Sequence, residues 1–127
     1  MAISDDIKTA RKYGVVHCGL LEQPNVEMIA LIRAFNRTAE LLNYREVDEA
    51  TARASVSRLL HREAAYDSEN MPEAQAINLT ERFLAQFGEE SKFFTNNWCV
   101  TTEATFDEGV LVLGSQRSGY FWVEDED

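Results

Sequence analysis

The hydrophobic pattern of this chain changes from a helical period to an alternating one near Lys92, and this change constrains the fold more than any other feature. Before that point, apolar residues recur at spacings of three and four, which is typical of helices with one buried face. After it, apolar and polar residues alternate, which is typical of strands. Helices followed by strands predict an α+β domain.

Three to four helices are expected in the N-terminal part of the chain. The pattern predicts helices over residues 4–13, from Pro24 or Asn25 to Asn43, and over residues 49–66 and 72–87. The second of these carries the clearest apolar stripe, made of Met28, Leu31, Ile32, Phe35, Ala39 and Leu42. Asp48 suits an N-cap, Pro72 suits a first helical position, and Gly88 suits the left-handed residue beyond a helix end. The apolar run 15–21 fits either a short strand or a buried connector.

The C-terminal part predicts a three-stranded antiparallel meander packed on these helices. Its strands are expected over residues 92–101, 110–113 and 120–123. The middle strand is apolar on both faces, as a central strand should be. Turn-forming residues at 107–109 and 114–119 separate the strands. We place Trp98 in the core, between the first strand and a helix.

The chain of 127 residues predicts one domain covering residues 1–127. It contains no run of about 18 apolar residues and no signal-peptide pattern at its start, so we expect a cytoplasmic protein without a membrane partner. In that compartment, buried free thiols at Cys18 and Cys99 are favoured over a disulfide between them.

Acidic residues are concentrated in the C-terminal half. The net charge is −10, and from Glu63 onward fourteen acidic residues face only three basic ones, whereas the first 62 residues are almost balanced. Such a surface repels nucleic-acid phosphate and attracts a basic partner. The simpler alternative is that these acids only keep the protein soluble.

No pattern of metal-binding or catalytic residues is visible, and no cofactor is expected. The sequence offers two histidines and two cysteines, without the spacing of a zinc site. In an extended segment, His17 and Cys18 point to opposite sides and are out of hydrogen-bond reach of each other. Glycines at 109, 114 and 119 suit turns, and no phosphate-binding loop is present.

One local feature hints at nucleic acid. The pattern of residues 38–62 resembles a helix-turn-helix, with Arg53, Arg58 and Arg62 on the second helix. The connection between the two helices is longer than the usual 3–4 residues. Arg53 and Arg58 also lie on different sides of a helix, so a solvated helix face is the favoured interpretation.

These observations favour a small, acidic, non-catalytic protein that masks, inhibits or chaperones a basic protein partner. It resembles immunity proteins, secretion chaperones and phage inhibitors in size, charge and fold class, without sharing a family motif with them. The predicted contact residues lie at or near the ends of the last two strands: Asp107, Glu108, Tyr120, Trp122, Glu124, Asp125 and Glu126. A DNA-binding regulator and an enzyme with a dispersed site around His17 or His61 are the alternatives.

A homodimer is a further expectation. If Tyr120–Val123 forms an exposed edge strand, it could pair with the same strand of a second copy. A helix lying over this edge would prevent that pairing.

Overall fold

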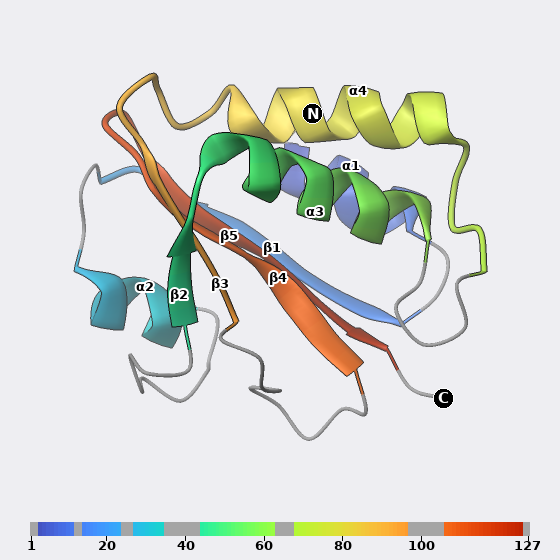
Figure 1. Cartoon of the computed structure of the whole chain (residues 1–127), viewed down its shortest axis with the longest axis horizontal. Coiled ribbons are helices and arrows are strands. Elements are labelled where there is room, and N and C mark those ends of the chain that lie inside the picture. Colours follow the sequence, from blue (N-terminus) through green and yellow to red (C-terminus); the bar gives the residue numbers. More distant parts are fainter. Residues whose placement is uncertain are drawn as a thin grey trace.

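A computed structural model of the chain describes residues 3–11, 14–23, 27–34, 44–62, 68–96 and 106–125. Within these ranges it contains four helices and one five-stranded antiparallel sheet, which confirms the α+β class (Figure 1). In chain order the elements are α1 (Ile3–Ala10), β1 (Val15–Leu21), α2 (Met28–Ala34), β2 (Tyr44–Val47), α3 (Glu49–His61), α4 (Glu73–Leu84), β3 (Lys92–Asn96), β4 (Phe106–Leu113) and β5 (Ser118–Asp125).

The sheet has the strand order β1-β5-β4-β3-β2. The predicted meander is present as β3, β4 and β5, with β4 central, but β1 and β2 extend it on both sides. The prediction of an exposed edge at Tyr120–Val123 is wrong, because β1 pairs with β5 along its length, from Val15 opposite Glu124 to Leu21 opposite Ser118. Among the described residues, the open edges of the sheet are therefore β1 and β2.

The predicted turn at Asp107–Gly109 is also wrong. These residues belong to β4, where Gly109 pairs with Trp122 of β5. A Cβ atom at Gly109 would lie only 2.1 Å from the carbonyl oxygen of Phe121, so this glycine permits close packing of β5 rather than a turn. The second predicted turn is confirmed in position, between Leu113 and Ser118.

The helices begin close to the predicted residues, and α1, α3 and α4 end earlier than predicted. Asp48 caps α3 by accepting a hydrogen bond from the Thr51 amide at 2.7 Å. Helix α3 ends at His61 because Arg62 is extended and bridges to Glu69. Gly88 has the expected left-handed conformation, with φ of 91°. Residues 35–43 and 63–67 of the predicted helices, like Trp98 and Cys99, lie outside the described residues.

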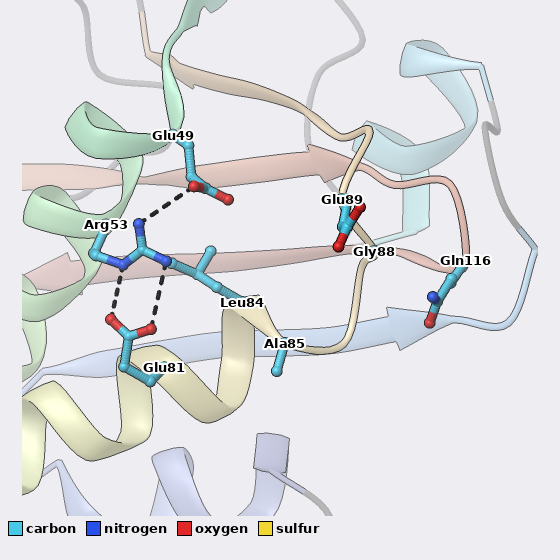
Figure 2. A pocket seen from close by; sticks show the side chains of 8 residues that line it. All are labelled: Glu49, Arg53, Glu81, Leu84, Ala85, Gly88, Glu89 and Gln116. Atoms are coloured by element: carbon cyan, nitrogen blue, oxygen red, sulfur yellow. Dashed lines mark hydrogen bonds and ion pairs between the residues drawn. The ribbon is translucent and has the colours of Figure 1, made fainter.

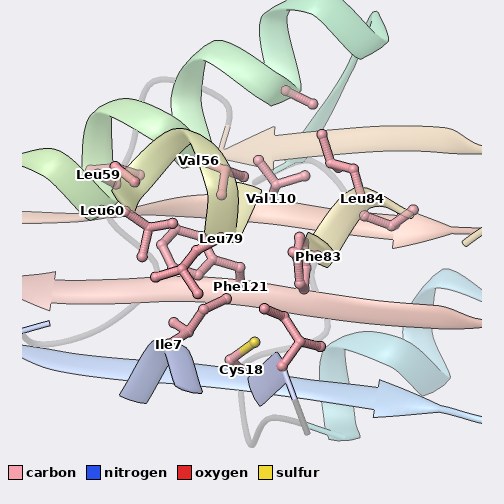
Figure 3. Packing of buried hydrophobic residues seen from close by; sticks show 14 of the residues in the cluster. Ile7, Cys18, Val56, Leu59, Leu60, Leu79, Phe83, Leu84, Val110 and Phe121 are labelled. Atoms are coloured by element: carbon pink, nitrogen blue, oxygen red, sulfur yellow. The ribbon is translucent and has the colours of Figure 1, made fainter. Parts of the chain in front are cut away.

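Helices α1, α3 and α4 cover one face of the sheet (Figure 1). Their buried side chains meet strand residues of alternating position, such as Cys18, Val110 and Phe121 (Figure 3). Phe83 of α4 is fully buried and makes an edge-to-face contact with Phe87, at 5.0 Å between ring centroids. Phe83 also contacts Phe121 of β5, at 6.2 Å between ring centroids, whereas α3 packs directly on β3 and β4.

Helix α2 packs on the opposite face. Its Leu31 and Ile32 join a second cluster with Leu111 and Trp122, which point away from the first three helices. Tyr44 lies edge-on to Trp122, at 5.8 Å between ring centroids. The sheet therefore separates two distinct apolar clusters.

Candidate functional site

Three of the acids predicted for partner binding, Asp107, Glu108 and Glu124, lie at one end of β4 and β5. Asp107 and Glu124 are direct cross-strand partners. However, Asp107 is buried and its carboxylate accepts a hydrogen bond from the Trp122 indole at 3.3 Å. Trp122 itself is fully buried. Neither side chain is available at the surface, because Trp122 belongs to the cluster beneath α2 and Asp107 is buried and bonded to it.

The other predicted acids have partners within the chain. Glu108 pairs with Arg58 of α3, and Glu124 pairs with His17 of β1 at 2.8 Å. Tyr120 is half-buried, and burial raises the pKa of its hydroxyl. The side chain of Asp125 and the whole of Glu126 lie outside the described residues. The binding role of this group stays a prediction.

A second group of acids surrounds a hollow of about 350 Å³ where α3 begins and α4 ends, which we call the acidic pocket (Figure 2). Four of its residues come from the two helices and the others from the segment after α4 and the β4–β5 turn. The residues around it are Glu49, Arg53, Glu81, Leu84, Ala85, Gly88, Glu89 and Gln116. Two of its three carboxylates, Glu49 and Glu81, pair with Arg53, whereas Glu89 lies across the hollow on the loop after α4 (Figure 2).

Arg53 joins two of these carboxylates across the helix pair. Its Nε donates to Glu81 Oε1 at 2.7 Å, and its Nη1 donates to Glu49 Oε2 at 3.4 Å (Figure 2). The hydrogen bond to Glu81 raises the pKa of the Arg53 guanidinium, so the cation persists at every ordinary pH. Arg53 connects α3 to α4 and offsets part of the local negative charge.

Arg53 does not neutralise the pocket, because it is one guanidinium against three carboxylates and because the two helix ends that meet here have opposite dipole charges. Glu49 lies in the first turn of α3, where the dipole favours a carboxylate, but Glu81 lies in the last turn of α4, where it does not. Glu89 follows shortly after α4, is exposed and has no ion pair with any described residue. The negative end of α4 and two carboxylates thus meet at one position.

The wall of the acidic pocket formed by the loop after α4 is held by backbone contacts. The Gln116 amide donates to the Phe87 carbonyl at 3.0 Å, and the Ser91 hydroxyl donates to the Gly88 carbonyl at 2.9 Å. A side chain at Gly88 would come within 2.4 Å of the Ser115 hydroxyl. Glycine at this position therefore lets the β4–β5 turn pack against the loop that carries Glu89.

A different pocket of about 390 Å³ lies at the opposite end of the same helix pair, and we call it the His61 pocket. It is lined by Ala54, Ser57, Arg58, His61, Glu73 and Ile77. The enzyme hypothesis expected a pocket joining a histidine to a carboxylate, and this one brings together His61 and Glu73. The His61 Nδ1 atom is hydrogen-bonded to the Met71 carbonyl at 2.8 Å, so only its Nε2 atom remains to act on a ligand.

The cysteine of the described residues is not activated. Cys18 is a free thiol beneath α1, and burial raises its pKa to about 12. It remains protonated at neutral pH and behaves as a small apolar side chain. Within the described part of the chain, no group of three His, Cys, Asp or Glu side chains is placed to hold a metal ion.

The helix-turn-helix hypothesis finds no structural support among the described residues. Strand β2 lies directly before α3, where that motif would place a short turn after its first helix. Arg53 and Arg58 are both paired with glutamates. The first helix of the proposed motif falls largely in residues 38–43, which lie outside the described ranges.

Sequence reasoning missed the acidic pocket because its carboxylates come from three separate segments. Glu81 and Arg53 are 28 positions apart, and no local pattern marks their contact. The only local signals were the N-terminal acids of α3 and the glycine after α4.

Across residues 3–11, 14–23, 27–34, 44–62, 68–96 and 106–125, no helix is both long and apolar enough to cross a membrane. No protein-family model matches the sequence, and no match was found among curated proteins or solved structures.

Proposed function

We propose that this protein is a non-catalytic binding protein whose acidic pocket receives a lysine or arginine side chain of a basic protein partner. The observation that carries the proposal is the grouping of three carboxylates around one hollow whose single guanidinium pairs with two of them, in a space large enough for such a side chain. Within the described part of the chain, Glu89 is the carboxylate of this pocket without an ion pair, since Glu49 and Glu81 already share Arg53.

The charge of the whole chain supports a basic partner. A net charge of −10 attracts a cationic protein over distances longer than contact and accelerates their encounter. The same charge repels the phosphates of nucleic acid. A protein with these properties is suited to mask, inhibit or chaperone its partner, and the binding should weaken steeply as salt is added.

The chemistry of the described residues favours binding over catalysis. Cys18 is a buried thiol with a raised pKa, and the imidazole of His17 is bonded to Glu124. His61 lines the same pocket as Ser57, but no hydrogen bond joins the two side chains among the described residues. A partner surface, rather than a reacting group, is the simplest use of the acidic pocket.

The test compares two charge reversals on the same helix pair. Glu89→Lys changes the acidic pocket, whereas Glu73→Lys changes the His61 pocket, and both alter the net charge by the same amount. Glu73 is a matched control because it is also exposed and has no ion pair with any described residue. The probe is a fluorescent arginine-rich peptide, titrated at about 50 mM and about 500 mM salt.

We expect the wild-type protein to bind the peptide at low salt and to release it at high salt. Glu89→Lys should raise the dissociation constant by about tenfold, and Glu73→Lys by about twofold at most, since the latter acts only through the general field. Equal effects of the two variants would show that general acidity, and not the pocket, attracts the peptide. Binding of a DNA duplex in place of the peptide would contradict the proposal altogether.

A further inference from the structure

The two open edges of the sheet differ in a way that bears on assembly. Strand β2 is four residues long and carries the charged residues Arg45 and Glu46. Strand β1 is seven residues long and contains neither Pro nor any Lys, Arg, Asp or Glu. Natural sheets usually protect their edges with short length, charge or proline, and β1 has none of these features.

The side chains of β1 add to this difference. Val15 is 53% exposed and is one of two large apolar side chains so exposed within the described residues. The one polar ring of the strand, His17, is already bonded to Glu124 of the neighbouring strand. Among the described strands, only β5 pairs with β1, so the backbone groups along its outer side have no strand partner there.

We infer that β1 pairs with β1 of a second copy, antiparallel and symmetric about Cys18, and thereby joins the two sheets into one. In this register each valine faces a larger leucine of the other copy: Val15 lies opposite Leu21, and Val16 lies opposite Leu20. It also places His17 opposite Gly19, which has no side chain of its own and is covered by the Tyr120 ring of β5.

The lack of charged residues on β1 favours a second copy of the chain over a basic protein as the partner at this edge. An uncharged strand gives a basic partner nothing to recognise, whereas two copies can approach there without carboxylates directly facing each other. The isologous contact also satisfies the backbone groups of both edges at once. The dimer contact is thus separate from the acidic pocket and stands whether or not that pocket binds a partner.

The first experiment uses sedimentation velocity over a range of protein concentration, with the wild-type chain and two matched variants. Val15→Lys places a charge on the β1 edge, and Ile77→Lys places the same charge at the other exposed apolar residue, on α4. We expect the wild-type chain to sediment as a dimer, with twice the chain mass of 14.4 kDa. Val15→Lys should raise the dissociation constant of the dimer by tenfold or more, and Ile77→Lys should leave it unchanged. Thermal unfolding confirms that both variants fold.

A wild-type protein that remains monomeric at about 500 µM, well above typical dissociation constants of stable dimers, would overturn the inference. So would a dimer that Val15→Lys leaves intact, or one that both variants weaken equally.

A second experiment tests the register by disulfide trapping in a Cys18→Ala, Cys99→Ala background. The double variant Val15→Cys, Leu21→Cys should form a covalent dimer under mild oxidation, because the register pairs these two positions. Each single variant should remain a monomer on a non-reducing gel. Trapping by a single variant, or none by the double variant, would overturn the register.

Discussion

The two ends of the α3–α4 pair share one antiparallel arrangement but differ in charge. At one end, the acidic pocket groups three carboxylates, those of Glu49, Glu81 and Glu89, with a single cation, Arg53. At the other end, the His61 pocket combines Arg58 and His61 with a single carboxylate, Glu73. The same two helices thus offer a surface for a cation at one end and a nearly balanced surface at the other.

This difference shows that the acidity of the chain is not spread evenly over its surface. The acids of the last two strands are mostly used internally, since Glu108 pairs with Arg58 and Glu124 with His17. Glu89 has no such ion pair among the described residues. Net charge alone therefore does not indicate where a partner binds. The better guide is whether each carboxylate is already paired with a basic side chain of the same chain.

The largest effect is expected from breaking the packing that holds both ends in place. Phe83→Ala removes a fully buried ring that contacts Phe87 and Phe121, and should lower the free energy of unfolding by about 3–5 kcal/mol. Ile77→Ala, at an exposed position on the same helix, should cost less than about 0.5 kcal/mol. Urea denaturation measures both, and similar losses would mean that α4 does not anchor on the sheet through Phe83.

A smaller effect is expected at Arg53, where a substitution should strengthen peptide binding at the acidic end of the α3–α4 pair. Arg53→Gln removes the one cation of the acidic pocket, so affinity for the arginine-rich peptide should rise by about three- to tenfold. The folded state should lose only about 0.2–1 kcal/mol, because both ion pairs of Arg53 are exposed. Titration and urea denaturation check the two effects.

Arg82→Gln serves as the control, since Arg82 pairs with Asp6 of α1 and lies outside the acidic pocket. If Arg53→Gln weakened peptide binding, the guanidinium would be part of the binding surface rather than a competitor for it.

The smallest effect concerns the N-cap next to the acidic pocket. Hydrogen bonds from Thr51 lower the pKa of Asp48. A carboxyl group with a lowered pKa in the folded state stabilises the fold above its unfolded pKa, and this contribution is lost as the pH falls through the folded value. Asp48→Ala should therefore lower the melting temperature at neutral pH, and the difference should vanish in strong acid. Thermal unfolding at several pH values measures it.

Glu46→Ala is the matched control, because Glu46 is exposed in β2 and caps no helix. A deficit of Asp48→Ala that persists unchanged in strong acid would show that the ionised carboxylate is not what stabilises α3.

Much of the fold could be predicted from the hydrophobic pattern. The helices 49–61 and 73–84 and the strand order β3, β4, β5 follow from local periodicity and from Asp48 and Pro72. Strand β2 was missed because its four residues carry two charges and follow a stretch with a helical pattern. The run at β1 was ambiguous because a short apolar segment fits a strand or a buried connector equally well.

The errors about sites have a common physical cause, which is contact between distant residues. Asp107–Gly109 have residue types that are typical of turns, but they form part of β4 because β5 packs closely against Gly109. Trp122 was expected at a surface, but its indole bonds to Asp107 beneath α2. Arg53 and Arg58 pair with glutamates that are 28 and 50 positions away in the sequence, so no local pattern predicts these ion pairs.

The measurement that tests the central claim most directly is a ¹⁵N-labelled NMR titration of the wild-type protein with the arginine-rich peptide. Binding at the acidic pocket predicts the largest amide shifts at Arg53, Gly88, Glu89 and Gln116, with little change around His61 and Glu73. Shifts concentrated at the His61 pocket or along β5, or spread evenly over the exposed acids, would contradict it.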